Sequence, residues 1–187
     1  HPVFNVVVSL ILMPFIKELA RISEWLTPAS HTPEKPKATA FIDEMQYSVP
    51  SVALSEASRE LTRVGNITAK MVQESCTALI NLDTANIKSV VAQENDLVDP
   101  ICKALASFTN TLVSKELTLA QQQRCFQIKN LLIDIERVGD MAEDIAEFAQ
   151  DSIVDLSVFS APATADLELL WNHAHRTYLL SIEAFTE

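Results

Sequence analysis

Hydrophobic residues recur with the 3.6-residue period of an α-helix along three long segments, about residues 51–82, 85–113 and 118–157. A fourth helical segment starts near Ala163 and is still running at Glu187. Short connections between long helices favour antiparallel neighbours. The pattern therefore predicts an all-α protein, an antiparallel three-helix bundle with an additional C-terminal helix.

The predicted helix ends carry recognisable signals. Asp83 or Thr84 can cap the second helix, and Thr118-Leu-Ala-Gln121 resembles the capping box that opens a helix. Pro100 falls inside the second helix, where it removes a backbone donor and predicts a kink. The end of the fourth helix loosely echoes the end of the first. We therefore interpret residues 51–157 as one bundle and residues 158–187 as the first helix of a truncated second repeat.

The first segment is different, because residues 2–16 contain no charged side chain. Basic residues follow it, as they do on the cytoplasmic side of a membrane span. We interpret residues 1–26 as an apolar transmembrane helix, the end of a last span whose start lies outside the chain, and residues 27–50 as a proline-containing linker. The alternative is a buried or interfacial helix of a soluble protein.

The two glycines of the chain lie in matching tripeptides, Arg63-Val64-Gly65 and Arg137-Val138-Gly139. Glycine costs a helix interior roughly 0.5–1 kcal/mol relative to alanine. Both glycines fall on the core-facing side of their predicted helices. The sequence therefore predicts close helix packing at both positions.

The chain is acidic, and its carboxylates suggest a cation site. The 187 residues include 25 acidic and 14 basic side chains, a net charge of −11, which excludes sequence-independent nucleic-acid binding. One quadrant of the third helix gathers a run of carboxylates, namely Glu136, Asp140, Glu143, Asp144, Glu147 and Asp151. Like charges four residues apart destabilise a helix by roughly 0.2–0.5 kcal/mol per pair, and a bound cation would relieve them. The alternative is a solvated acidic face.

Glu94 lies in the middle of the apolar stripe of the second helix. A buried carboxylate has to be paired, metal-bound or protonated. If Glu94 and Asp99 approach Glu136 and Asp140 across the bundle, four oxygen donors converge, as in helical-bundle metal sites. The alternatives are that Glu94 reaches out at a bundle end or pairs with an arginine, Arg63 or Arg137.

No catalytic arrangement is evident in the sequence. It shows no nucleophile-plus-base pair and no phosphate-cradling glycine loop. The cysteines Cys76, Cys102 and Cys125 are isolated and fit no zinc spacing. We therefore expect a protein that is not an enzyme.

The run Asp134-Ile-Glu-Arg-Val-Gly-Asp140-Met-Ala-Glu-Asp-Ile-Ala-Glu147 resembles the signature of PhoU domains, and Gln93-Glu-Asn-Asp-Leu-Val-Asp99 resembles its counterpart on the second helix. The resemblance spans about residues 51–157. The sequence departs from it at Asn95, where the family carries an acidic residue. We expect iron or another divalent or trivalent cation near Glu136, Asp140 and Asp99, with Glu94 and Asp144 completing the candidate set, and no other cofactor.

The N-terminal run, His1-Pro-Val-Phe-Asn5 followed by apolar residues up to Met13-Pro14-Phe15, is similar to the last membrane segment of bacterial sodium/phosphate cotransporters. This resemblance implies a cytoplasmic PhoU-like regulatory domain of a sodium:phosphate symporter in the inner membrane. The missing membrane part would handle phosphate and sodium. The partners would be that membrane domain and a second copy of the chain, as a homodimer. The alternatives are a soluble PhoU-type regulator of phosphate uptake or signalling, and a structural bundle without a ligand.

Overall fold

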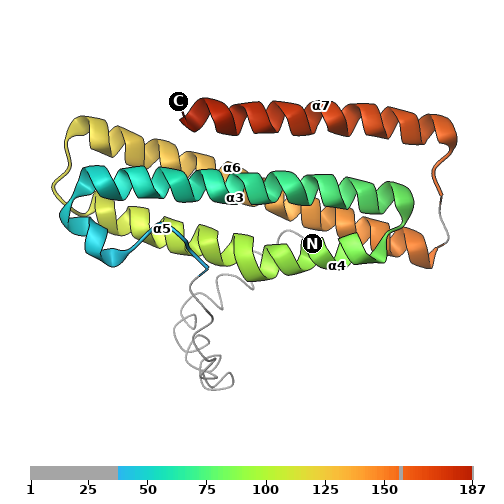
Figure 1. The fold of residues 1–187 in the computed structure, drawn as a ribbon, viewed down its shortest axis with the longest axis horizontal. Coiled ribbons are helices and arrows are strands. Elements are labelled where there is room, and N and C mark those ends of the chain that lie inside the picture. Colours follow the sequence, from blue (N-terminus) through green and yellow to red (C-terminus); the bar gives the residue numbers. More distant parts are fainter. Residues whose placement is uncertain (1–37, 156–157, 187) are drawn as a thin grey trace, which may run out of the picture. The chain divides into compact units, whose positions relative to one another are not determined.

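The computed structural model describes residues 38–155 and 158–186, and all regular secondary structure within them is helical (Figure 1). A short 3₁₀ helix, η2 (Glu44–Ser48), precedes the long helix α3 (Pro50–Asn81). The chain returns through α4 (Thr84–Gln93), η3 (Glu94–Val98) and α5 (Asp99–Val113), and it continues with α6 (Leu119–Val154) and α7 (Ala161–Thr186). The predicted all-α class is confirmed for these residues.

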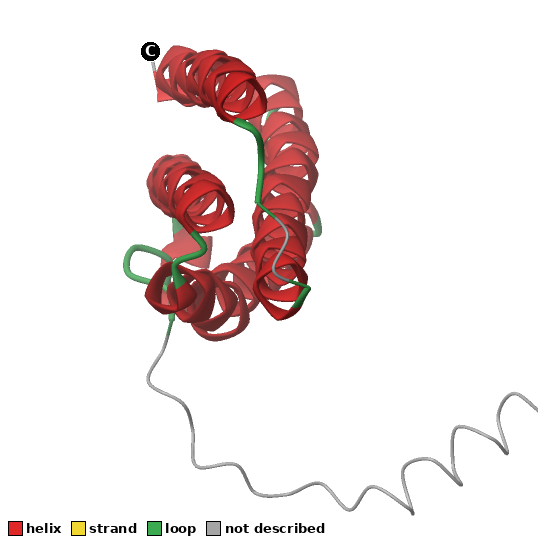
Figure 2. Ribbon diagram, turned by 90° about the vertical axis from the view of Figure 1, so that its right-hand side faces the viewer, coloured by secondary structure: helices red, strands yellow, loops and turns green. Residues whose placement is uncertain are grey.

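Three helical rods form the bundle, namely α3, the α4–η3–α5 rod and α6, as the view along their axes shows (Figure 2). Their facing stripes are buried; on α6 the stripe includes Ala142, Ala146 and Ala149, each with no exposed surface. Side chains this small let the neighbouring helices approach closely. The Glu136–Asp140 segment is therefore held on a rigid rod.

Two helix starts follow local capping rules. Asp83 caps α4 by accepting from the backbone N–H groups of Ala85 and Asn86, and Thr118 and Gln121 form the predicted capping box of α6. The end of α3 is less regular, because Leu82 adopts a left-handed conformation with φ of 53°. Glycine or asparagine is the usual residue in that conformation.

The predicted kink at Pro100 takes a different form in the structure. The prediction of one α-helix over 85–113 is corrected by the π-helical turn η3, which separates α4 from α5. Within it the backbone N–H of Asp99 bonds to the carbonyl of Glu94, five residues earlier. Proline lacks an N–H and clashes with the preceding turn, and a wider turn accommodates both defects.

The segment before α3 packs on the bundle. It is the described part of the predicted linker, residues 27–50. Ile42 is buried, and Glu60 accepts hydrogen bonds from the backbone N–H groups of Ala40 and Phe41, at 2.9 and 2.7 Å. Arg63 bonds both to the Glu60 carboxylate and to the carbonyl of Ala38. The buried Glu60 thus fixes this segment to α3.

Helix α7 lies along α3 (Figure 1). A side chain on Gly65 would place a Cβ 2.9 Å from Cδ1 of Ile182, so glycine at this position admits α7. The hydroxyl groups of Thr68 and Tyr178 lie 2.7 Å apart and link the same two helices. The predicted close packing at Gly65 is confirmed, with α7 as one of the partners.

Within residues 38–155 and 158–186, no helix is both long enough and apolar enough to cross a membrane. The predicted span, residues 1–26, lies outside the described residues.

Candidate functional site

The candidate site centres on Glu94, the first residue of the π-helical turn η3. Its side chain is 5% exposed and points toward α6. An ideal Cβ on Gly139 would lie 2.6 Å from Oε2 of Glu94 and 3.2 Å from Cγ1 of Val98. Any larger residue at position 139 would displace the carboxylate. The glycine of the second tripeptide therefore makes room for a buried acid.

The carboxylate of Glu94 is incompletely paired. Its Oε2 atom is buried and accepts no hydrogen bond from the described residues. The alternative pairing with an arginine is wrong for Arg63, which binds Glu60 instead, and Arg137 is exposed. An unpaired buried oxygen costs about 1–3 kcal/mol, and more when it is charged.

The surroundings of Glu94 are negative. Burial, followed by the charges of Asp140, Glu143, Asp99 and Glu136, raises the pKa of Glu94 to about 7. Desolvation and like charges both disfavour the ionised form of a carboxylic acid. Glu94 therefore changes its charge near neutral pH, where an ordinary glutamic acid is fully ionised.

The thiol of Cys102 is near most of the negative charges that surround Glu94. Cys102 is buried on α5, and burial, followed by the charges of Glu136, Glu94, Asp99 and Asp140, raises its pKa to about 12. A thiol with so high a pKa is unreactive at neutral pH. Cys102 thus belongs to the packing beneath the carboxylates.

The predicted metal ligands are only partly brought together. Asp99 forms an ion pair with Lys103, at 2.5 Å, while Asp140 and Asp144 are exposed and Glu136 is half-buried. Across the 38–155 and 158–186 ranges, no group of three or more His, Cys, Asp or Glu side chains is arranged to hold a metal ion. The site as it stands is a buried acid ringed by carboxylates at longer range.

Asn95 occupies the position at which the sequence departs from the resembled pattern. Its Nδ2 donates to Oε1 of Glu143 at 3.4 Å, a long hydrogen bond across the two rods. A neutral amide here lowers the local negative charge that a cation would neutralise.

Sequence reasoning missed one buried acid altogether. Glu60 has no exposed surface and receives both backbone N–H groups and the Arg63 guanidinium. Its position on the apolar stripe of α3, between Ala57 and Leu61, was a signal of the same kind as that of Glu94. Unlike Glu94, it has full pairing, and it therefore acts as a structural anchor.

The region that contains this site matches a known family. Residues 61–149 match the PhoU domain, from the first third of α3 to the last turns of α6. The match covers slightly less than half of the chain and relates this segment to PhoU domains. The matched segment includes Glu94, Asp99, Gly139 and most of the acidic face of α6.

Relatives align outside the PhoU domain as well. The chain is 22% identical to a protein of Escherichia coli K12 named "Putative inorganic phosphate export protein YjbB", over 99% of the chain and 34% of that protein. The Salmonella typhimurium protein of the same name is 23% identical over the same shares. The chain therefore spans about a third of the length of these curated relatives.

A shorter similarity covers half of the chain. The chain is 27% identical to the "Phosphate-specific transport system accessory protein PhoU homolog" of Clostridium acetobutylicum, over 50% of the chain and 43% of that protein. No solved structure matches the chain with significant similarity. This similarity thus relates part of the chain to a protein named as an accessory of phosphate-specific transport.

Proposed function

We propose that the chain is the cytoplasmic regulatory part of a phosphate transport protein of the inner membrane, which a membrane domain precedes. The carrying observation is the similarity to the YjbB relatives over 99% of the chain, which includes the apolar N-terminal run as well as the PhoU domain. We give the helical bundle a regulatory role because one relative is named an accessory protein of phosphate-specific transport.

Sodium-coupled symport of inorganic phosphate is the transport that we propose for the whole protein. It rests on the likeness of residues 1–15 to cotransporter segments, while the names of the YjbB relatives refer to export. The experiment is therefore a measurement of phosphate flux in both directions, in vesicles that contain the full-length protein with and without a sodium gradient. Sodium-dependent flux supports the symport, and an absence of any phosphate flux contradicts the transport function.

The second candidate is a PhoU-type regulator that acts on a separate transporter or sensor. The similarity to the Clostridium PhoU homologue over half of the chain favours it. Extraction of the parent protein from cells separates the two functions. A protein that leaves the membrane fraction only in detergent supports the first candidate, and one released by salt washing alone supports the second.

We also propose that the bundle responds to a cation at the carboxylates around Glu94. The buried Oε2 atom without a hydrogen-bond donor is the observation in favour, and Glu136, Asp140 and Asp99 supply further oxygen atoms nearby. Iron or another divalent or trivalent cation suits such oxygen ligands. A cation would have to draw these side chains together, because they form no three-ligand group as they stand.

Elemental analysis of the purified protein tests the cation. Co-purifying iron, manganese or zinc that is lost in Asp140→Asn supports it. Protein that is metal-free and unchanged in thermal stability on addition of these ions contradicts it. The membrane domain and a second copy of the chain remain the proposed partners.

A further inference from the structure

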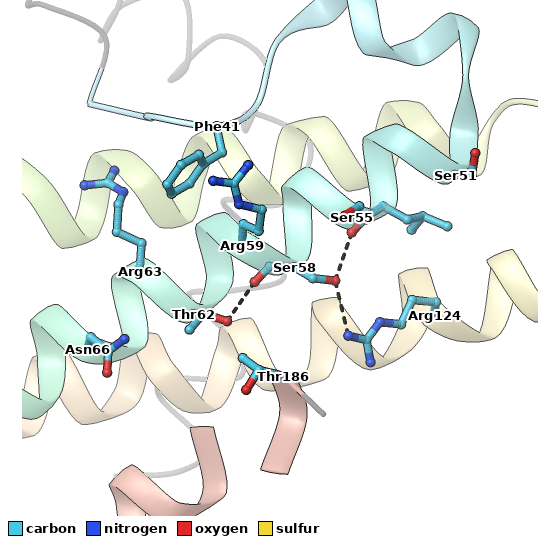
Figure 3. Close-up of a pocket in the computed structure, with 11 residues that line it drawn as sticks. Phe41, Ser51, Ser55, Ser58, Arg59, Thr62, Arg63, Asn66, Arg124 and Thr186 are labelled. Carbon is cyan, nitrogen blue, oxygen red and sulfur yellow. Dashed lines mark hydrogen bonds between the residues drawn. The ribbon is translucent and has the colours of Figure 1, made fainter. Parts of the chain in front are cut away.

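A polar groove lies on the bundle away from the carboxylate site. It has a volume of about 700 Å³ and runs along the first half of α3. Phe41 of the lead segment closes one side, and Arg124 of α6 and Thr186 of α7 stand on the other (Figure 3). Four separate parts of the chain therefore meet around it.

The floor of the groove is a polar stripe on α3. Ser51, Ser55, Ser58 and Thr62 follow one another at intervals of three or four residues, which places them on one face of the helix. Thr62 donates to the backbone carbonyl of Ser58, and Ser58 donates to that of Leu54. A hydroxyl group can donate one hydrogen bond and accept others. The stripe thus offers adaptable hydrogen-bonding groups, most of them in reach of solvent.

Three arginines line the groove of this acidic protein, and two of them are paired with glutamates that lie beside the lining. Arg59, Arg63 and Arg124 are three of the six arginines in the chain, and no acidic side chain lines the groove. Arg59 bonds to Glu56 through Nη1, and Arg63 bonds to Glu60 through Nε and Nη2. A guanidinium has five N–H donors, so each arginine keeps donors for another partner.

Of the three arginines that line the groove, Arg124 is the one without an ion pair to a carboxylate among the described residues. The ion pairs of the described residues do not include it, and its hydrogen bonds run to neutral oxygens: Ser58 Oγ and Phe185 O at 3.3 Å, and Gln127 Oε1 at 3.4 Å. Its guanidinium also lies 4.0 Å above the ring centroid of Phe185. Burial lowers the pKa of Arg124, which reflects the cost of a charge withdrawn from water without a counter-ion.

We propose that this groove binds a phosphate-type oxyanion, with Arg124 as its main anchor and Arg59 and Arg63 beside it. Guanidinium groups match the oxygens of phosphate in a two-pronged geometry, and charge-assisted hydrogen bonds are the strong ones. The hydroxyl group of Ser55 supplies a further donor at the floor, whereas that of Ser58 already donates to Leu54 and accepts from Arg124. The carboxylate site and the groove then divide the bundle into a cation-type and an anion-type site.

Two sources of such an anion fit the chemistry, free inorganic phosphate and a phosphate carried on a small organic molecule. The volume lies in the range of sites for small organic ligands, and Phe41 and Leu54 add apolar wall. Both sources use the same arginines. The inference does not rest on transport by the parent protein, because it concerns equilibrium binding to the bundle alone.

The test is calorimetric titration of the whole chain, in detergent, with inorganic phosphate and with AMP. We expect at least one of the two to bind with a Kd of about 1 mM or tighter. Arg124→Gln should weaken that binding about tenfold or more, and Arg59→Gln should weaken it several-fold. Tighter binding of AMP would identify an organic phosphate, and tighter or equal binding of phosphate would identify the free ion.

Arg176→Gln is the matched control, because Arg176 is an exposed arginine of α7 outside the groove. It removes the same charge and should leave the affinity unchanged. Circular dichroism confirms that each variant is folded. The proposal is overturned if neither ligand binds, or if Arg124→Gln and Arg59→Gln bind as tightly as the unmodified chain.

Discussion

Glu94 and Gly139 act as one unit, because the carboxylate occupies the space that any side chain at position 139 would fill. Overpacking a well-packed core typically costs about 1–3 kcal/mol, whereas alanine in place of glycine favours a helix by up to about 1 kcal/mol. We therefore expect Gly139→Ala to lower the free energy of unfolding by about 1 kcal/mol. Chemical denaturation of the variant measures this change.

The double variant Glu94→Ala/Gly139→Ala provides the control for that prediction. With the carboxylate gone, the close contact that remains is with Cγ1 of Val98, at 3.2 Å, and the helix-propensity gain of alanine remains. Gly139→Ala should then cost less stability in the Glu94→Ala background than in the unmodified chain. Equal destabilisation in both backgrounds would show that Glu94 is not what glycine accommodates.

The raised pKa of Glu94 predicts that the free energy of unfolding depends on pH. Its pKa is about 7 in the folded protein against an ordinary 4.5, so between these values the folded state keeps a proton that the unfolded state releases. The stability from this proton is complete below about pH 4.5 and is lost as the pH rises through 7, a loss on the order of 3 kcal/mol. Glu94→Gln should remove that loss.

Denaturation of chelator-treated protein at several pH values measures this effect as the difference between the two proteins. Other carboxylates titrate in both proteins and cancel in the difference. We expect Glu94→Gln to be more stable than the unmodified chain at about pH 8 and close to it at about pH 5. A difference that does not change with pH would contradict the raised pKa.

At the scale of elements, Glu60 fixes the lead segment to α3. Its Oε2 atom accepts from Ala40 and Phe41, and its Oε1 atom accepts from Arg63. Glu60→Gln replaces one of these acceptors by a donor, which leaves N–H groups of its partners unpaired. We expect the amide hydrogens of Ala40 and Phe41 to exchange about ten- to a hundredfold faster.

Glu56→Gln is the matched control for that exchange measurement. Glu56 lies one turn earlier on α3 and pairs with Arg59, whose side chain is 57% exposed. Exposed ion pairs contribute only about 0–1 kcal/mol. The exchange at Ala40 and Phe41 should therefore change little in Glu56→Gln, and a similar acceleration in both variants would refute the anchoring role of Glu60.

Two irregular features lie at the two ends of α4. The π-helical turn η3 presents Glu94 to α6, and the αL residue Leu82 ends α3 just before α4. The π-helical turn is wider than an α-helical turn, and the αL residue reverses the chain direction sharply. Together they set the register of the α4–η3–α5 rod against its neighbours. Register then decides that Glu94, rather than Asn95 or Asp96, meets Gly139.

At the scale of the whole molecule, the net charge of −11 opposes compaction. The Debye length falls from about 30 Å at 0.01 M salt to about 3 Å at 1 M, so added salt screens the repulsion along α6. We expect the thermal midpoint to rise as sodium chloride increases over this range, measured by circular dichroism. A constant or falling midpoint would show that ion pairs outweigh the repulsion.

A divalent or trivalent cation at matched ionic strength separates screening from binding. If the carboxylates around Glu94 hold an ion, millimolar manganese should raise the thermal midpoint by more than sodium chloride does, through mass action on the folded state. Asp140→Asn should remove this excess and keep the response to sodium chloride. An excess that persists in Asp140→Asn would place the ion elsewhere.

The sequence by itself determined the helices, because hydrophobic period, capping residues and proline positions are local properties. It also singled out Glu94 and both glycines, since each breaks the rule of its own stripe. It did not show the π-helical turn, since proline specifies a disturbance of the helix but not its form. The groove also escaped prediction, although the stripe from Ser51 to Thr62 was visible, because Arg124 and Thr186 reach it from distant parts of the chain.

Only the tertiary structure decided the partner of each buried acid. Glu60 and Glu94 look alike in sequence, yet one receives two backbone N–H groups and an arginine while the other faces Gly139 with an unpaired oxygen. The physical reason is that pairing depends on positions in three dimensions that sequence spacing along one helix does not encode. The amphipathic pattern thus specified the bundle. Packing between its rods specified which buried carboxylate is paired, Glu60, and which keeps an unpaired oxygen, Glu94.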